Sequence, residues 1–187
     1  MPTAREAKKA ETRARLMRET ARLVLVRGTE GTTVADVASA VGVSARTFHN
    51  YFASLEAALE EFLHAQAQAF RAELDQAPAG ASLLDTVEEI VLDSFHGNST
   101  DNVDNVVSVF RICTALESIH GASVSATFLP SLANRETSIA LYGLLAIAWA
   151  AVDAYQHLPE PRDPADGEEL IREAFETARN LGSIRLP

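Results

Sequence analysis

Apolar residues recur every three to four positions along almost the whole chain, which is the spacing of one face of an α-helix. Glycine, proline and short clusters of polar residues separate the apolar segments, and no segment shows the alternation typical of a β-strand. The pattern therefore predicts an all-α protein. The expected helices lie at about residues 16–27, 34–41, 44–51, 55–77, 83–97, 101–120, 123–134, 136–158 and 166–182.

Several of these helix ends carry residues that cap the backbone. Thr33, followed three residues later by Asp36, predicts a capping box, in which each side chain accepts a hydrogen bond from the other residue's backbone N–H. Gly28 suits the end of the first helix, because glycine readily adopts the positive φ of a helix C-terminus. Two later helices are expected to begin at pairs of acidic residues, Asp101 with Asp104 and Asp166 with Glu169.

The two short helices on either side of residues 41–44 form the pattern of a helix-turn-helix. Gly42 supplies the positive φ of the tight turn, Val43 fills the core beneath it, and small Ala38 lies where the two helices cross. The second helix would enter the major groove of DNA, although a helical hairpin without that function is the alternative. Its outward residues would be Ala45, Arg46, His49 and Asn50, with Thr33, Ser44 and Tyr51 close to phosphates.

Charge is divided unevenly along the chain. Its 187 residues contain 16 Lys and Arg against 26 Asp and Glu, and this net charge of −10 argues against binding nucleic acid over the whole surface. Up to Leu55, however, nine basic residues face five acidic ones, so this part carries +4 and the remainder −14. Such a basic segment is either a solvated tail or a local polyanion-binding surface. Its coincidence with the helix-turn-helix favours the second interpretation.

Other chemistry is sparse. Cys113 is the single cysteine, which excludes an internal disulfide, and the five histidines lack zinc-ligand spacing. No HExxH, P-loop or glycine-rich dinucleotide motif occurs, so no catalytic residue, metal or cofactor is predicted. The chain starts with a charged segment rather than a signal peptide, and its longest uncharged apolar stretch, 137–152, is short for a membrane span. A cytoplasmic protein without membrane contact is expected.

The helix-turn-helix region resembles the TetR family of bacterial transcriptional regulators. The similarity covers residues 13–63, where order and spacing match through 28–38, 41–44 and 47–52. It implies a homodimer with a three-helix DNA-binding domain, here 1–53, joined through a fourth helix to a larger helical ligand-binding and dimerisation domain, here 54–187. By position, it implies DNA contacts at Thr33, Ala45, Arg46, Phe48, His49, Asn50 and Tyr51, supported by Ser44 and Thr47.

Three positions depart from the family pattern. Leu55 stands where the family usually has a phosphate-binding lysine, and Thr29 where an aromatic residue is frequent. Arg46 replaces a residue that is often small, and it suits a bidentate contact to guanine as well as it suits a phosphate contact or solvation. Phe48 fits the core better than a base contact, whereas His49 is expected to touch DNA.

The apolar segment 136–158 has two different faces. Rotation by about 100° per residue places glycine and alanine on one narrow stripe and bulky residues opposite. Because small residues allow close approach, we expect this helix and the last one to form a four-helix dimer interface with a second copy, as the resemblance also implies. Packing within one subunit is the alternative. The interface residues would be Gly143, Ala146, Ala150, Ala154, Leu170, Ala174, Ala178 and Leu181.

The opposite face of the same helix would line an effector site. Ordinary core packing is the simpler explanation for any single residue there, and a buried inert thiol is favoured over a redox role for Cys113. The region also resembles TetR members that bind acyl-CoA-like ligands, through the helix of Trp149 and the terminal helix, 170–181. The candidate ligand-binding residues are Phe95, Phe110, Arg111, Cys113, Thr114, Glu117, Phe128, Leu132, Leu145 and Trp149.

The predicted function is therefore ligand-responsive transcriptional regulation, with repression favoured. A dimer would bind a pseudo-palindromic DNA operator, and a small apolar or amphipathic effector, with acyl-CoA-like molecules as one candidate class, would release it. A helical adaptor that binds another protein is the main alternative, and an enzyme acting on a bound thioester is a weaker one.

Overall fold

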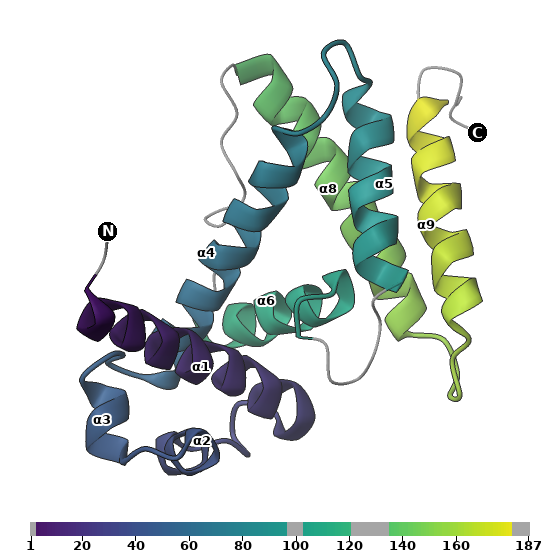
Figure 1. Cartoon of the computed structure of the whole chain (residues 1–187). Coiled ribbons are helices and arrows are strands. Elements are labelled where there is room, and N and C mark those ends of the chain that lie inside the picture. Colours follow the sequence, from purple (N-terminus) through teal and green to yellow (C-terminus); the bar gives the residue numbers. More distant parts are fainter. Residues whose placement is uncertain (1–2, 97–102, 121–134, 181–187) are drawn as a thin grey trace. The chain divides into compact units, whose positions relative to one another are not determined.

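A computed structural model describes residues 3–96, 103–120 and 135–180 of the chain. The regular elements in these ranges are all helices, which confirms the predicted all-α class (Figure 1). The predicted segment 123–134 lies outside the described residues. The helices are α1 (Ala4–Arg27), α2 (Val34–Val41), α3 (Ala45–His49), α4 (Leu55–Leu74), α5 (Leu83–His96), α6 (Val106–His120), α8 (Arg135–Gln156) and α9 (Pro164–Arg179).

The chain divides into two compact units. Unit 1 comprises Met1–Gln66 with Arg111–Phe128, and unit 2 comprises Ala67–Phe110 with Leu129–Pro187. Helices α4 and α6 each contribute residues to both units. The expected domains are defined by function, with DNA binding assigned to 1–53 and ligand binding and dimerisation to 54–187. This division stays a prediction.

Helix α1 is longer than its apolar pattern indicated. The side chains of Thr3 and Glu6 form a reciprocal capping box at its start, so the basic N-terminal segment is helical from Ala4 onward. The Thr-x-x-Glu spacing in the sequence is the signal for this start. The helix ends at Gly28, which adopts a φ of 75°, as expected of a glycine that follows a helix.

Helices α1 to α4 enclose the apolar core of unit 1. Leu16 and Phe48 are fully buried in it, and Val43 packs against its edge as predicted for the turn. Because this core fixes one side of α2 and α3, it also fixes which of their side chains face solvent. The buried members are Leu16, Leu23, Val37, Ala38, Val41, Phe48, Phe52 and Ala58.

Helices α5, α8 and α9 pack against one another in unit 2 (Figure 1). The rings of Phe95 and Tyr155 meet edge to face, 5.2 Å between centroids. Ile171 and Phe175 on α9 are fully buried in the same core. Gly167, one turn before Ile171, lies directly against the Phe95 ring, so α9 approaches α5 closely only because this position has no side chain.

Replacing Gly167 with alanine is expected to destabilise unit 2. A Cβ there would lie 2.9 Å from Cε1 and Cε2 of Phe95 and still closer to Cζ, and Phe95 is only 1% exposed. Overpacking of this kind costs about 1–3 kcal/mol, which chemical denaturation would measure. Combined with Phe95→Leu, which makes room, Gly167→Ala should cost much less than it does alone. Simply additive losses would contradict the packing argument.

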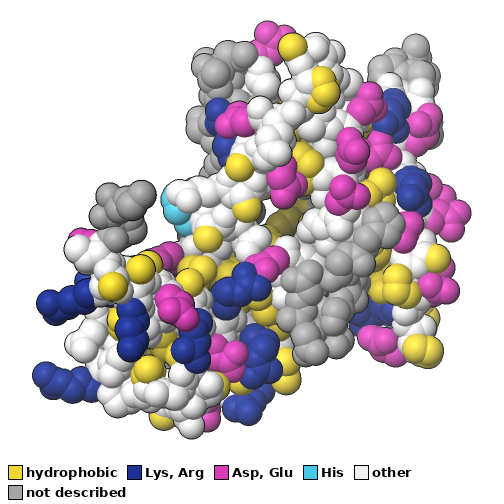
Figure 2. Space-filling view, in the orientation of Figure 1, with side chains coloured by type: hydrophobic (Ala, Val, Ile, Leu, Met, Phe, Trp, Pro, Cys, Tyr) yellow, Lys and Arg dark blue, Asp and Glu magenta, His cyan; other side chains and the backbone are white. Residues whose placement is uncertain are grey.

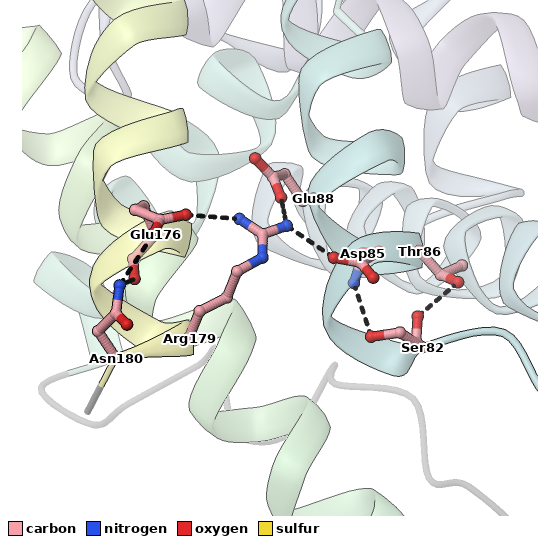
Figure 3. A network of polar contacts seen from close by, with 7 residues as sticks. All are labelled: Ser82, Asp85, Thr86, Glu88, Glu176, Arg179 and Asn180. Carbon is pink, nitrogen blue, oxygen red and sulfur yellow. Dashed lines mark hydrogen bonds and ion pairs between the residues drawn. The ribbon is translucent and has the colours of Figure 1, made fainter. Parts of the chain in front are cut away.

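A polar network joins the last turn of α9 to the start of α5 (Figure 3). Arg179 donates to Asp85 at 2.6 Å and to Glu88, and it pairs with Glu176 at 3.5 Å. The hydrogen bond from Arg179, followed by that with Ser82, lowers the pKa of Asp85. Because Arg179 and Asp85 face solvent, the network contributes more to the alignment of the two helices than to stability.

Among the described residues, one side of helix α8 carries exposed apolar side chains. Glu136–Gln156 has a mean hydropathy of 1.5, and by length and composition alone it could cross a membrane, but only 22% of this window is buried. Leu141 and Val152 lie on the side that packs in the core of unit 2. On the other side, Ile139 is 61% exposed and Tyr142 37%. A continuous apolar face of this kind is typical of an interaction surface.

The predicted start of α6 is wrong. The helix begins at Val106, and Asn105 caps it by accepting a hydrogen bond from the backbone N–H of Ser108 at 2.7 Å. Asp104 precedes this cap, and Asp101 lies outside the described residues. Asparagine caps a helix as well as aspartate does, and here the amide is 2% exposed, so its packing also favours this position.

The predicted cap of α9 is also wrong. Asp163, rather than Asp166, caps the helix by accepting from the N–H of Ala165 at 2.9 Å. Pro164 is then the first helical residue, where its missing N–H costs nothing and its fixed φ suits a helix. Asp166 lies in the first turn, where its charge interacts favourably with the helix dipole.

Candidate DNA-binding site

The turn between α2 and α3 has the geometry that the sequence predicted. Gly42 adopts a left-handed φ of 78°, and its N–H donates to the Ser39 carbonyl at 3.1 Å. The N–H of Val43 donates to the Ala38 carbonyl at 2.8 Å, which completes the end of α2. Ala38 is 2% exposed, so its small side chain fits between the packed elements. The turn therefore holds α3 in a defined direction relative to α2.

Helix α3 presents a polar face to solvent. Its N-cap, Ser44, accepts from the N–H of Thr47 at 3.1 Å, and the two hydroxyl oxygens lie 2.8 Å apart. The exposed residues of the helix and its C-cap could reach base edges or phosphates in a major groove. Of the predicted DNA contacts, the structure places Ser44, Ala45, Arg46, His49 and Asn50 in the exposed class and Thr47 and Tyr51 in the half-buried class.

Phe48 is the exception among the residues that the resemblance placed on DNA. It is fully buried, and its ring packs against Phe52 with 5.7 Å between centroids. A side chain in this position cannot touch DNA without leaving the core. Phe48 is therefore corrected to a core residue, in agreement with its apolar character, and its role is to anchor α3.

Thr33 is the N-cap of α2, and its side chain forms hydrogen bonds in the capping box with Asp36. Its hydroxyl donates to Asp36 at 2.5 Å, and the Asp36 carboxylate also accepts from the Thr33 N–H at 2.9 Å. These hydrogen bonds, together with Arg27 at 3.8 Å, lower the pKa of Asp36. A DNA contact of Thr33 would have to compete with this capping box.

Basic side chains are concentrated on the N-terminal helices, which include the helix-turn-helix. On the face shown in Figure 2, Lys and Arg side chains lie over α1 to α3, and Asp and Glu side chains concentrate over α5 and α9. Two of the basic residues also make contacts within the protein, because Arg13 and Arg15 donate to the carbonyls of Tyr51 and Val41. Nothing local in the sequence distinguishes these two arginines from the others on α1.

The candidate ligand-binding residues fall into both units. Phe95, Phe110, Leu145 and Trp149 belong to unit 2, where the Phe110 and Trp149 rings lie 4.4 Å apart. Arg111 on α6 donates to the Leu25 carbonyl at 2.8 Å within unit 1. Cys113 is buried, Thr114 is exposed and Glu117 is half-buried, all in unit 1, whereas Phe128 and Leu132 lie outside the described residues. Burial, with Glu117 nearby, raises the pKa of the Cys113 thiol to about 12.

A shallow surface pocket lies on unit 2, away from the candidate ligand-binding residues. Its volume is about 330 Å³, and it is lined by Asp85, Glu88, Glu89, Leu92, Asp93 and Arg172 on α5 and α9. None of these residues was predicted to bind a ligand. Within the described ranges, no group of three or more His, Cys, Asp or Glu has an arrangement that could hold a metal ion.

The predicted dimer-interface residues lie on two helices of unit 2. Gly143, Ala146, Ala150 and Ala154 are exposed on α8. On α9, Leu170, Ala174 and Ala178 are half-buried and pack beside the core, and Leu181 lies outside the described residues. The pattern of α9 had not indicated Ile171 and Phe175, which form its fully buried side.

Comparisons with known proteins agree with this geometry. Residues 16–62 match the family model of bacterial regulatory proteins, tetR family. Over 83 residues, or 44% of the chain, the sequence is 42% identical to the HTH-type transcriptional regulator TcmR of Streptomyces glaucescens, and the match spans 37% of that protein.

Solved structures of similar fold extend the comparison over nearly the whole chain. A crystal structure described as a TetR-family transcriptional regulator from Syntrophomonas wolfei aligns over 95% of this chain and 98% of its own, with a TM-score of 0.61 and 16% identity. Another, from Mesorhizobium loti, aligns over 92% and 96%, with a TM-score of 0.53 and 12% identity. The helix-turn-helix, the matching family model and this shared fold therefore agree. Residues 16–62 match the tetR family of bacterial regulatory proteins, and the whole chain shares its fold with two TetR-family transcriptional regulators.

Proposed function

We propose that this regulator is a dimeric, ligand-responsive repressor that binds a pseudo-palindromic DNA operator. The observation that carries the proposal is the exposed polar face of α3, with Arg46, His49 and Asn50 in solvent and Phe48 buried beneath them. A helix held in this way fits the major groove with its side chains toward base edges. Neutralisation of phosphates by the surrounding basic residues would supply much of the affinity, so binding should fall steeply with salt.

Reading two half-sites requires two copies of α3, and the exposed apolar face of α8 supports a dimer. Gly143, Ala146, Ala150 and Ala154 are exposed there beside the large apolar residues Ile139 and Tyr142. A second copy packed on this face would bury apolar surface and allow close helix–helix contact in a two-fold symmetric interface. Helix α9, which packs beside α8, would complete the four-helix arrangement.

Release from DNA would follow when a small apolar or amphipathic effector binds in unit 2. The rings of Phe110 and Trp149, which meet at an interplanar angle of 54°, are the apolar groups that such a ligand would have to contact in the core of unit 2. Helices α4 and α6 contribute to both units, so a shift of either would change the geometry of unit 1. The effector must prefer the conformation that does not bind DNA, because equal affinity for both conformations shifts nothing.

The test is a band-shift titration with DNA from around the protein's own gene, where we expect sequence-preferring binding by the wild-type dimer. If Arg46 reads a guanine, Arg46→Ala should cost about 1–3 kcal/mol at one operator position. Equal weakening on every sequence would instead identify a phosphate contact. Arg5→Ala, which removes an exposed arginine from the first turns of α1, is the matched control and should weaken all sequences alike. If no sequence-preferring complex forms, the proposal is wrong.

A further inference from the structure

Arg13 lies among the basic residues of α1 but makes internal contacts. Its Nε donates to Glu61 Oε1 on α4 at 2.5 Å, and Nη2 pairs with the other oxygen of the same carboxylate. Its Nη1 donates to the carbonyl oxygen of Tyr51 at 2.9 Å. Its guanidinium carbon lies 4.5 Å from the centre of the Phe52 ring. One side chain thus connects α1, α4 and the residues that directly follow α3.

The geometry of these contacts is specific to a guanidinium. A planar fork can bind both oxygens of a carboxylate while a further N–H reaches a carbonyl, which the single ammonium of lysine cannot reproduce. The hydrogen bond with Glu61 raises the pKa of Arg13. The two side chains are 40% and 35% exposed, so water screens their attraction, and the fixed direction of the contacts matters more than the charge.

The carbonyl that Arg13 contacts belongs to Tyr51, in the turn that follows the C-cap of α3, Asn50. The N–H groups of Tyr51 and Phe52 both donate to the Phe48 carbonyl, at 2.8 and 3.0 Å, so the chain stays wound through Phe52. A carbonyl just beyond a helix end has no donor from the helix itself, and Arg13 supplies one to the carbonyl of Tyr51. Because α3 has only five residues, it depends on such tertiary contacts for its order.

A neighbouring arginine makes the same kind of contact one helix earlier. Arg15 donates to the carbonyl of Val41, the last residue of α2, at 3.1 Å. The same region of α1 therefore contacts the end of α2 and the turn that follows α3. This repetition indicates that Arg13 and Arg15 orient the helix-turn-helix relative to α1.

We propose that Arg13, held by Glu61, is a positioning residue for DNA recognition that acts through α3 rather than by binding phosphate. The inference rests on the proposed DNA-binding function. For the removal of the Glu61 charge, the positioning role and simple electrostatics predict opposite effects on DNA affinity. Removing an acidic charge near a DNA-binding surface should strengthen binding if electrostatics decided the outcome. It should weaken operator binding if the carboxylate holds Arg13 in place.

The experiment measures fluorescence anisotropy of operator DNA and of a scrambled duplex over a series of salt concentrations. Glu61→Gln should weaken operator binding about tenfold, the scale of a lost charge-assisted hydrogen bond, with an unchanged salt slope. Arg13→Gln should weaken it similarly, and the double variant should be no weaker than Arg13→Gln alone. Glu11→Gln is the matched control, because it removes the same charge from an exposed position of α1, and it should leave binding unchanged or slightly stronger.

Amide hydrogen exchange at Asn50, Tyr51 and Phe52 gives a readout that does not depend on DNA. In Glu61→Gln these amides should exchange faster, while the amides of α5 and α9 keep their wild-type rates. Unchanged exchange, or operator binding that stays equal or tightens, would overturn the positioning role. A wild-type protein without sequence preference would instead overturn the proposed function, and exchange alone would then decide the role of Arg13.

Discussion

Replacing Phe48 with alanine is expected to lower the free energy of unfolding of unit 1 by about 3–5 kcal/mol and to abolish specific DNA binding. Phe48 is fully buried, and its ring packs against Phe52 in the core that holds α3. Truncation removes that apolar contact and leaves a cavity that a short helix cannot fill by itself. Because small domains are stable by only about 5–15 kcal/mol, the loss is a large fraction of the total. Denaturant unfolding and amide exchange in α1 to α3 would measure it.

The next residue along the same helix provides the control. His49 is exposed, so His49→Ala should change the free energy of unfolding by less than about 0.5 kcal/mol, as surface substitutions usually do. It should nevertheless weaken operator binding if His49 touches DNA. The two variants would then distinguish the role of Phe48 in the core from the role of the exposed face of α3 in DNA binding. Equal destabilisation by both substitutions would contradict the assignment of Phe48 to the core and His49 to the surface.

Replacing Ala150 with glutamate is expected to convert the proposed dimer into monomers. Ala150 is exposed in the middle of the small-residue stripe of α8, with Ala146 one turn before it and Ala154 one turn after it. In the proposed interface, each copy would bury an unpaired carboxylate, which costs several kcal/mol. A cost of that size raises the dimer Kd by more than about a hundredfold. Light scattering over a range of protein concentrations would measure the mass.

A second alanine-to-glutamate substitution tests whether the effect is specific to this face. Ala72 is exposed on α4, so Ala72→Glu adds the same charge to a helix surface outside the stripe and should leave the dimer intact. Circular dichroism should show equal helix content for both variants. A dimer that survives Ala150→Glu would refute the proposed interface, and dissociation by both variants would show that added charge, not position, is responsible.

The sequence by itself determined the helices, the turn and the faces of the helices. Thr33 with Asp36, Gly42 and Ser44 act on atoms within four residues of themselves, so their capping geometry is a local property and could be predicted. The small stripe of α8 followed from helical periodicity, which fixes the direction of each side chain around the axis. At the starts of α6 and α9 the pattern indicated Asp104 and Asp166, whereas Asn105 and Asp163 cap these helices.

Only the tertiary structure decided which charged side chains form contacts with distant parts of the chain. Arg13 and Glu61 are 48 residues apart, and Arg15 and Val41 are 26 apart. Such contacts depend on the packing of whole helices, which brings distant residues together without leaving a local pattern. The net charge of +4 up to Leu55 coincides with the helix-turn-helix. It could not separate the arginines that face outward from those that hold the helices, because charge depends on composition alone and a hydrogen bond depends on position in space.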